Sequence, residues 1–133
     1  MNPTELVKLA KQAMQRAYVP YSGYKVGAAL LTKGGKVYLG CNIENAAFGP
    51  SNCAERTAFF TAIAAGETEF ESIAGVGGKD GVVADIFPPC GVCRQVMMEF
   101  APELTVICLN KNGESKRFAL RELLPYGFDQ TWL

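Results

Sequence analysis

Three of the five cysteines stand where they could share one metal ion. Cys53 opens one predicted helix, and Cys90 and Cys93 form a Cys-x-x-Cys pair at the start of another. Residues three apart in a first helical turn lie on one side, so this pair can bind one ion, and zinc takes such thiolates. Three protein ligands leave the fourth position of a tetrahedral ion open, which is typical of a catalytic site. Glu55, two residues after Cys53, could move protons to and from a metal-activated water.

The net charge of this candidate site requires a nearby cation. Three thiolates on Zn²⁺ make the site anionic, which raises the pKa of a bound water above the value of about 7 found with neutral ligands. Arg56 and Arg94 each directly follow a residue of the site. A guanidinium bonded to the sulfurs would withdraw charge from the metal. Helix N-termini would also stabilise the thiolates through their free backbone N–H groups.

The spacing alone leaves other interpretations of these residues open. A Cys-x-x-Cys pair could be a redox centre, or it could complete a structural zinc site with Cys41 or Cys108. Both of these cysteines lie in apolar runs of strand length, where a free cysteine is usually a small buried hydrophobic residue. Glu55 stands three residues after Asn52 and could be a capping-box carboxylate. The spacing does not decide between these roles and a catalytic zinc site.

The composition narrows the possible chemistry and the possible partners. The 133 residues contain no histidine, which excludes imidazole-based triads and nitrogen-ligated zinc. Lys and Arg number 13, as do Asp and Glu, and this balance argues against nucleic acid or an acidic membrane as partner. No apolar run approaches the ~20 residues of a membrane span, and the first ten residues do not resemble a signal peptide. We therefore expect a single domain, residues 1–133, in the cytoplasm, with free cysteines and no disulfide framework.

The pattern of apolar residues, caps and breakers predicts helices and strands in alternation. In chain order these are a helix capped by Asn2 and ending near residue 18, strands at 26–31 and 36–43, a helix at 53–65, a strand at 72–76, a helix at 91–100, strands at 104–109 and 116–119, and a helical turn at 121–124. Residues 77–89 are predicted to be a loop containing glycine and proline. The helix at 53–65 has no charged residue after its first turn, which predicts that it is buried all round.

This order of elements predicts an α/β fold. The Lys33-Gly34-Gly35 turn joins the first two strands in an antiparallel hairpin. The following strand–helix–strand–helix–strand segment predicts parallel neighbours, because a helix crosses between consecutive strands. We therefore expect a mixed five-stranded sheet with helices packed on its faces. Such crossovers bring successive helix N-termini to the same sheet edge, which would place Cys53 beside Cys90 and Cys93.

Two motifs resemble the paired zinc motifs of the cytidine and deoxycytidylate deaminase superfamily, and within it those of the small cytidine deaminases. The motifs are Cys53-Ala54-Glu55-Arg56-Thr57 and Pro89-Cys90-Gly91-Val92-Cys93-Arg94-Gln95. Supporting matches cover nearly the whole chain, at residues 17–22, 26–30, 40–46 and 122–125. The resemblance implies a three-layer α-β-α cytidine-deaminase-like sandwich with one catalytic zinc ion per chain, which favours that reading over a redox or structural centre.

The same resemblance implies an activity. It is the hydrolytic deamination of cytidine and 2′-deoxycytidine to uridine and 2′-deoxyuridine plus ammonia, a reaction of pyrimidine salvage, by a zinc-activated water with Glu55 as proton shuttle. Family members of this size are typically homotetramers. An alternative is a related zinc deaminase that acts on another aminopyrimidine nucleoside or analogue. A polynucleotide deaminase is disfavoured, because it needs a basic channel that a balanced charge does not supply.

The resemblance also implies roles for residues around the metal. Asn42 and Glu44 would bind ribose hydroxyls, and Tyr24 would pack against the base, where the family usually carries Phe. The other implied residues are Ala54, whose N–H would read the base edge with Glu55; Pro88, whose carbonyl would accept from the leaving amino group; Arg56 and Gln95, near the ligand sulfurs; and Phe48 and Phe128, which match positions that reach a neighbouring subunit. Phe48 and Phe128 could equally be ordinary core or rim residues. Residues 49–51 and the loop at 77–88 depart from the common family pattern.

Overall fold

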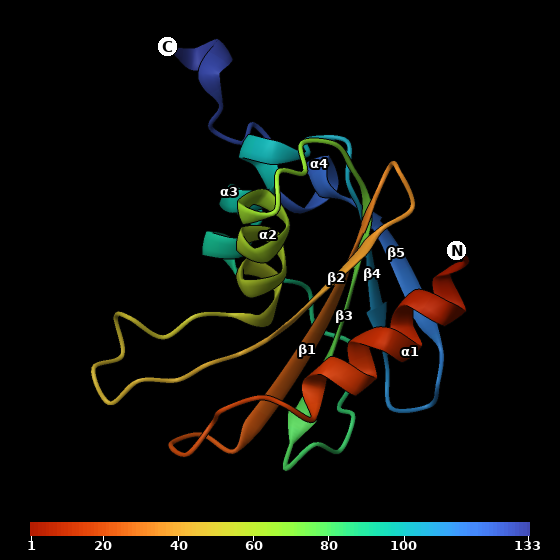
Figure 1. Cartoon of the computed structure of the whole chain (residues 1–133), viewed down its shortest axis with the longest axis vertical. Helices are drawn as coiled ribbons and strands as arrows, with labels where there is room; N and C mark the ends of the chain where they lie inside the picture. The colour runs from red at the N-terminus through yellow and green to blue at the C-terminus, as the bar shows by residue number, and fades with distance from the viewer.

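A computed structural model describes all 133 residues, and Figure 1 shows its helices and strands. The helices are α1 (Pro3–Met14), α2 (Ala54–Ala64), α3 (Gly91–Phe100) and α4 (Leu120–Leu123), followed by a 3₁₀ helix at Gln130–Trp132. The strands are β1 (Tyr24–Thr32), β2 (Val37–Cys41), β3 (Phe70–Lys79), β4 (Thr105–Leu109) and β5 (Ser115–Ala119). Every element predicted from the sequence is present. None of the helices has the length and apolar character needed to span a membrane.

The five strands form one mixed sheet in the order β2-β1-β3-β4-β5. β1 is antiparallel to both β2 and β3, β3 and β4 are parallel, and β5 returns antiparallel to β4. The predicted mixed five-stranded sheet is therefore confirmed. The expectation that the strands on either side of α2 are neighbours was wrong, because β1 lies between them. β1 is suited to this central place because its residues from 27 to 32 are all buried, although successive side chains point to opposite faces.

The relative directions of the strands bring two helix starts together. β2 and β3 run the same way, since both are antiparallel to β1. α2 follows β2 and α3 follows β3, so both helices begin beyond the same edge of the sheet. The crossover pattern in the sequence predicted this meeting of N-termini correctly, although the strands themselves are not adjacent.

Helices cover both faces of the sheet, which gives three layers (Figure 1). α1 packs on one face, where Leu6 lies in an apolar core with Leu31 of β1. α2 and α3 pack on the other face, where Phe59 lies in a larger core with Leu30 of β1. Adjacent residues of β1 thus enter opposite cores, as the alternation of side chains along a strand requires.

Two predicted boundaries differ from the structure by three residues or more, and both differ because of non-local pairing. α1 ends at Met14 and not near residue 18. The Tyr18 N–H donates to the Asn42 carbonyl (3.0 Å), and the Glu44 N–H donates to the Tyr18 carbonyl (2.8 Å), so this part of the chain runs extended beside the segment after β2. β3 continues to Lys79, three residues beyond its predicted end, because its last residues pair with the start of β1.

α2 is buried only on the side that faces the sheet and α3. Phe59 is fully buried, whereas Phe60 is 47% exposed and Thr61 is also exposed, so the prediction of burial all round was wrong for the single chain. On the buried side α2 approaches β2 very closely at Gly40. A Cβ atom on Gly40 would lie 2.3 Å from the Ala54 carbonyl oxygen, so only glycine lets the first turn of α2 rest directly on the strand.

Candidate active site

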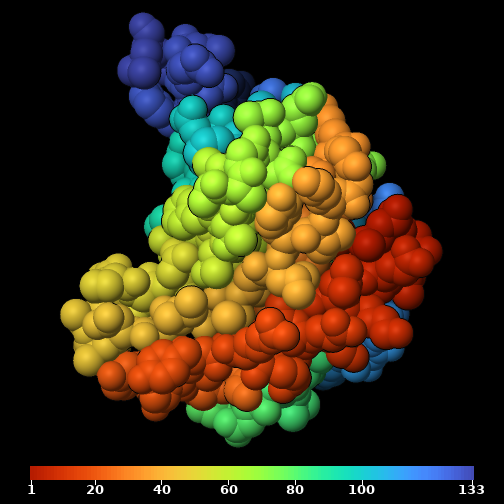
Figure 2. Space-filling model, in the orientation of Figure 1, coloured from red at the N-terminus to blue at the C-terminus, as the bar shows by residue number.

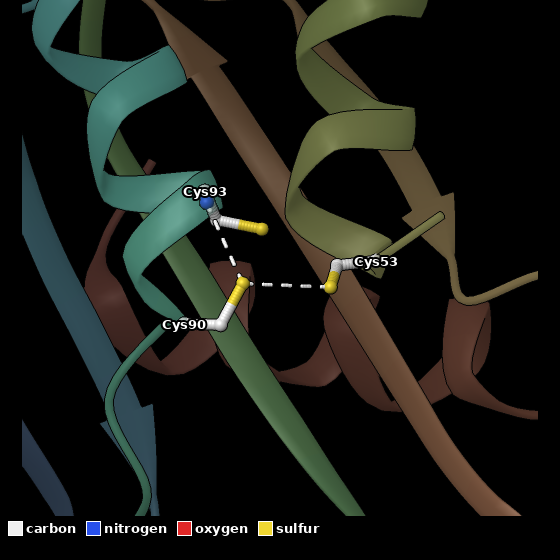
Figure 3. Close-up of side chains that lie close together, drawn as sticks. All are labelled: Cys53, Cys90 and Cys93. Atoms are coloured by element: carbon white, nitrogen blue, oxygen red, sulfur yellow. Dashed lines mark hydrogen bonds between the residues drawn. The ribbon is translucent and has the colours of Figure 1, made fainter. Parts of the chain in front are cut away.

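The sulfur atoms of Cys53, Cys90 and Cys93 converge between the first turns of α2 and α3 (Figure 3). Cys53 and Cys90 are the N-cap residues of the two helices, and Cys93 lies in the first turn of α3. All three sulfurs lie within 4.8 Å of one another, and those of Cys53 and Cys90 are 3.6 Å apart. Two sulfurs bound at ~2.3 Å to one tetrahedral zinc ion lie about 3.8 Å apart. The spacing and the donor chemistry therefore fit zinc, with a fourth position left for water.

Hydrogen bonds within the cluster favour the thiolate form of Cys53. Nη2 of Arg56 donates to Sγ of Cys53 over 3.3 Å, and the Cys93 backbone N–H donates to Sγ of Cys90 over 3.5 Å. The pKa of Cys53 is lowered to about 5, first by a hydrogen bond from the Cys93 thiol and then by Arg56. The pKa of Cys93 is raised, chiefly because it donates this hydrogen bond. Arg56 thus lies where a guanidinium can withdraw charge from a ligand sulfur.

Arg94 does not bond to the sulfurs, so the expectation that it offsets their charge was wrong. Its Nε donates to the Pro89 carbonyl (2.7 Å), and its Nη1 donates to the Leu123 carbonyl (2.6 Å). An α-helix turns by about 100° per residue, which directs Arg94 away from the side of α3 that carries Cys93. Arg94 therefore joins the segment before α3 to the end of α4.

Glu55 lies in the first turn of α2, beside the sulfur cluster, and is only 6% exposed. Burial, and to a smaller extent the negative charge of Cys53, raise the pKa of its carboxyl group to about 7. The capping-box interpretation is not supported, because Cys53 and not Asn52 is the N-cap residue and no capping box forms at α2. The Asn52 side chain donates instead to the Thr57 hydroxyl (3.0 Å).

A cavity of about 180 Å³ opens beside the cluster, and Glu55 is one of the residues that line it. The residues that line it are Val26, Asn42, Cys53, Ala54, Glu55, Phe87, Pro88 and Cys90. Two of these, Val26 and Phe87, were not singled out from the sequence. The run that begins at Val26 was interpreted only as a strand, and Phe87 lies in a loop without periodicity. The position of Phe87 directly before Pro88 was the available signal.

Asn42 is held rigidly at the cavity wall by the backbone of β1. Its Oδ1 accepts from the Val26 N–H (2.9 Å), and its Nδ2 donates to the Tyr24 carbonyl (2.8 Å). A primary amide has a second N–H and a second acceptor lone pair. Asn42 therefore keeps one donor and one acceptor for a ligand.

Glu44 lies outside the residues that line the cavity and anchors the turn before β1. Its carboxylate accepts from the backbone N–H groups of Tyr21 (3.0 Å) and Ser22 (3.1 Å) and from the Ser22 hydroxyl. These bonds, chiefly that from the Ser22 hydroxyl, hold the pKa of Glu44 below its usual value. Glu44 is therefore fixed as a carboxylate next to the turn that leads into Tyr24.

Tyr24 also lies beside the cavity and not in its wall. Its ring packs edge-on against Phe87, with centroids 6.0 Å apart and planes at 70°.

Gln95 makes no hydrogen bond to a sulfur. Its Nε2 donates to the Phe128 carbonyl (2.7 Å), which connects α3 to the C-terminal segment.

Phe48 and Phe128 are both on the surface, 79% and 57% exposed. In the chain alone neither is a core residue, which leaves a rim position or a contact with a neighbouring subunit for each of them. Figure 2 shows the segments that carry them, around residues 44–52 and at the C-terminus, as two separate projections from the body of the molecule.

Cys41 and Cys108 remain apart from the sulfur cluster. Cys41 lies in β2 next to Arg16 and Thr57, and Cys108 is buried in β4. Only the other three cysteines form a group that could hold a metal. Burial raises the pKa of both outlying thiols, to about 11 in Cys108. The geometry gives no support to a closed four-sulfur structural site.

An α/β fold that presents three converging thiolates, a buried carboxylate and an adjoining cavity defines a metal-dependent hydrolytic enzyme. Residues 1–109 match the family model described as the cytidine and deoxycytidylate deaminase zinc-binding region. The chain belongs to this family of zinc enzymes.

Relatives of known name and structure agree with this assignment. The chain is 48% identical to a cytidine deaminase of Halalkalibacterium halodurans, over 96% of this chain and 95% of that protein. It is 44% identical to a cytidine deaminase of Sporosarcina psychrophila, over 98% and 93%. The crystal structure of a Burkholderia pseudomallei cytidine deaminase, 48% identical, superposes with a TM-score of 0.89 over 96% of this chain and all of that one. The predicted three-layer fold is thus confirmed.

Proposed function

We propose that this protein hydrolyses cytidine and 2′-deoxycytidine to uridine and 2′-deoxyuridine with release of ammonia. The observation that carries the proposal is the placement of the buried Glu55 in the wall of a small cavity that Cys53 and Cys90 also line, where three sulfurs are spaced for zinc. The match to cytidine deaminases over nearly the whole chain supports the choice of substrate.

Cys53, Cys90 and Cys93 would hold one zinc ion per chain, which when bound supplies a Lewis acid that lowers the pKa of a water molecule. Glu55 accepts the proton that this water loses as it adds to C4 of the pyrimidine, and delivers it to N3. Glu55 then passes the second proton of the water to the amino nitrogen, which leaves as ammonia. One carboxylate thus serves both transfers and ends in its starting form.

Five other residues would hold the nucleoside. Asn42, with its remaining donor and acceptor, and Glu44, as a fixed carboxylate, would bind ribose hydroxyls. The Ala54 N–H would bind the base edge together with Glu55, and the Pro88 carbonyl would accept from the amino group at C4. Asn42, Ala54 and Pro88 line the cavity, which supports these roles. Tyr24 would contact the base from beside Phe87.

We infer that the whole chain acts as one catalytic domain that assembles into a homotetramer. Phe48, Phe128 and Phe60 of α2 all expose large apolar surface, which a single chain leaves in water. Phe48 and Phe128 would contact a neighbouring subunit close to its cavity. All five cysteines are free, which supports a cytoplasmic location, since that compartment keeps thiols reduced.

A spectrophotometric assay of cytidine loss, run alongside zinc stoichiometry, tests the proposal. We expect turnover of cytidine and deoxycytidine with one zinc per chain. Cytosine lacks the ribose that Asn42 and Glu44 would bind, and a monophosphate would be repelled by Glu44, so both should be poor substrates. Activity on the monophosphate alone, or on another aminopyrimidine but not on cytidine, would contradict the proposal.

A further inference from the structure

Phe87 forms part of the cavity wall, although it belongs to neither zinc motif. It lies in the loop between β3 and α3, directly before Pro88, and it is half-buried. The same cavity is lined by Pro88 and by Val26 of β1. A bulky ring is therefore placed next to the carbonyl that would accept from the substrate amino group.

Neighbouring residues fix the position of this ring. Tyr24 packs against it edge-on, at 6.0 Å between centroids. On the β3 side the ring occupies space that a side chain at Gly77 would fill: a Cβ there would lie 3.0 Å from Cζ of Phe87 and 2.9 Å from Cγ2 of Val26. The loop is also joined to the turn before β1, because the Asp80 N–H donates to the Gly23 carbonyl (2.7 Å). Such a braced ring cannot easily move aside for a ligand.

The chemistry of the base indicates which atom of the pyrimidine lies next to the Phe87 ring. In cytosine, C4 is flanked by N3 on one side and by C5 on the other. In the proposed function Glu55 protonates N3, and the Pro88 carbonyl accepts a hydrogen bond from the amino group on C4. The ring atom on the other side of C4 from N3 is C5. Val26 and Phe87 are the lining residues without an assigned role, and Phe87, which directly precedes Pro88 in the chain, is the one placed to face C5. This step rests on the proposed function.

We propose that Phe87 sets substrate specificity at C5 of the pyrimidine, by closing the cavity against substituents larger than hydrogen. The wild-type protein then deaminates cytidine in strong preference to 5-methylcytidine. Removing the ring opens the room that one methyl group needs. One methylene in an apolar pocket is worth about 10- to 200-fold in discrimination.

The test compares kcat/KM for 5-methylcytidine and for cytidine on the same preparation of each variant. In Phe87→Ala we expect the ratio of the two values to rise by about tenfold or more. Phe87→Leu keeps apolar bulk and should raise the ratio by less. Because a ratio is independent of the fraction of active protein, partial loss of fold or of zinc in either variant does not obscure the result.

Val82→Ala is the matched control, since Val82 lies in the same loop but is 72% exposed and outside the cavity. Its ratio should equal that of the wild type. An unchanged ratio in Phe87→Ala and Phe87→Leu, with cytidine still turned over, overturns the role of Phe87 and leaves the proposed function intact. A zinc-loaded wild type that releases no ammonia from cytidine overturns the proposed function and this inference with it.

Discussion

Gly40→Ala perturbs the site from a distance, through the contact between β2 and α2. The new Cβ would lie 2.3 Å from the Ala54 carbonyl oxygen and 2.5 Å from the Ala58 nitrogen, where ordinary contacts begin at 3.4 Å. The strand and the helix must therefore separate by at least 3.4 − 2.3 = 1.1 Å. β2 leads to Asn42, and the first turn of α2 carries Glu55, so this shift displaces the two sides of the cavity relative to one another. A displacement of about 1 Å can cost about 100-fold in rate.

We therefore expect kcat/KM for cytidine to fall about 100-fold in Gly40→Ala, and overpacking to lower the free energy of unfolding by about 1–3 kcal/mol. The rate is measured by loss of cytidine absorbance, and stability by denaturant unfolding with zinc present. Gly75→Ala is the matched control in the same sheet, because a Cβ at Gly75 meets no atom within 4 Å, and it should behave as the wild type. Wild-type activity and stability in Gly40→Ala would refute the reasoning.

Three further predictions concern single side chains. Glu55→Gln should keep the fold and one zinc per chain but lose about 10²- to 10⁴-fold in kcat, because only proton transfer is removed; full activity would contradict the mechanism. Cys41→Ser and Cys108→Ser should each retain one zinc by metal analysis, and loss of metal in either would indicate a fourth protein ligand. Arg94→Gln should lower the melting temperature, because it removes hydrogen bonds to the carbonyls of Pro89 and Leu123. An unchanged melting temperature would show that these bonds add nothing to stability.

Local signals in the sequence were sufficient for the elements that carry the metal ligands. Pro89 before Cys90 and Pro102 beyond Phe100 fix both ends of α3, whose predicted and observed bounds agree. The two helix starts meet because a helix follows each of two strands that run in the same direction, and the order of elements alone indicates this. The sulfur cluster was therefore predictable from chain order and residue type.

Features that depend on non-local pairing were not predictable in the same way. The place of β1 between β2 and β3 and the early end of α1 result from contacts between segments far apart in sequence. The role of Arg94 was predicted wrongly because a residue that is next to Cys93 in the sequence need not lie on the same side of the helix. Phe87 was missed because residues in a loop follow no periodic pattern. Its contact with Tyr24, which is far away in the sequence, is seen only in the folded structure.

The central position of β1 constrains the order of events during folding. β3 is connected to the β1–β2 hairpin only by its pairing with β1, as at Leu30 and Ile73, and such long-range closure is the slow part of assembling a β-rich chain. The Cys90–Cys93 pair is local and is ready as soon as the first turn of α3 forms, whereas Cys53 stands 37 residues before Cys90 and arrives with the completed sheet. Complete capture of the ion is therefore a late step of maturation, and it marks a chain that has already reached its native topology.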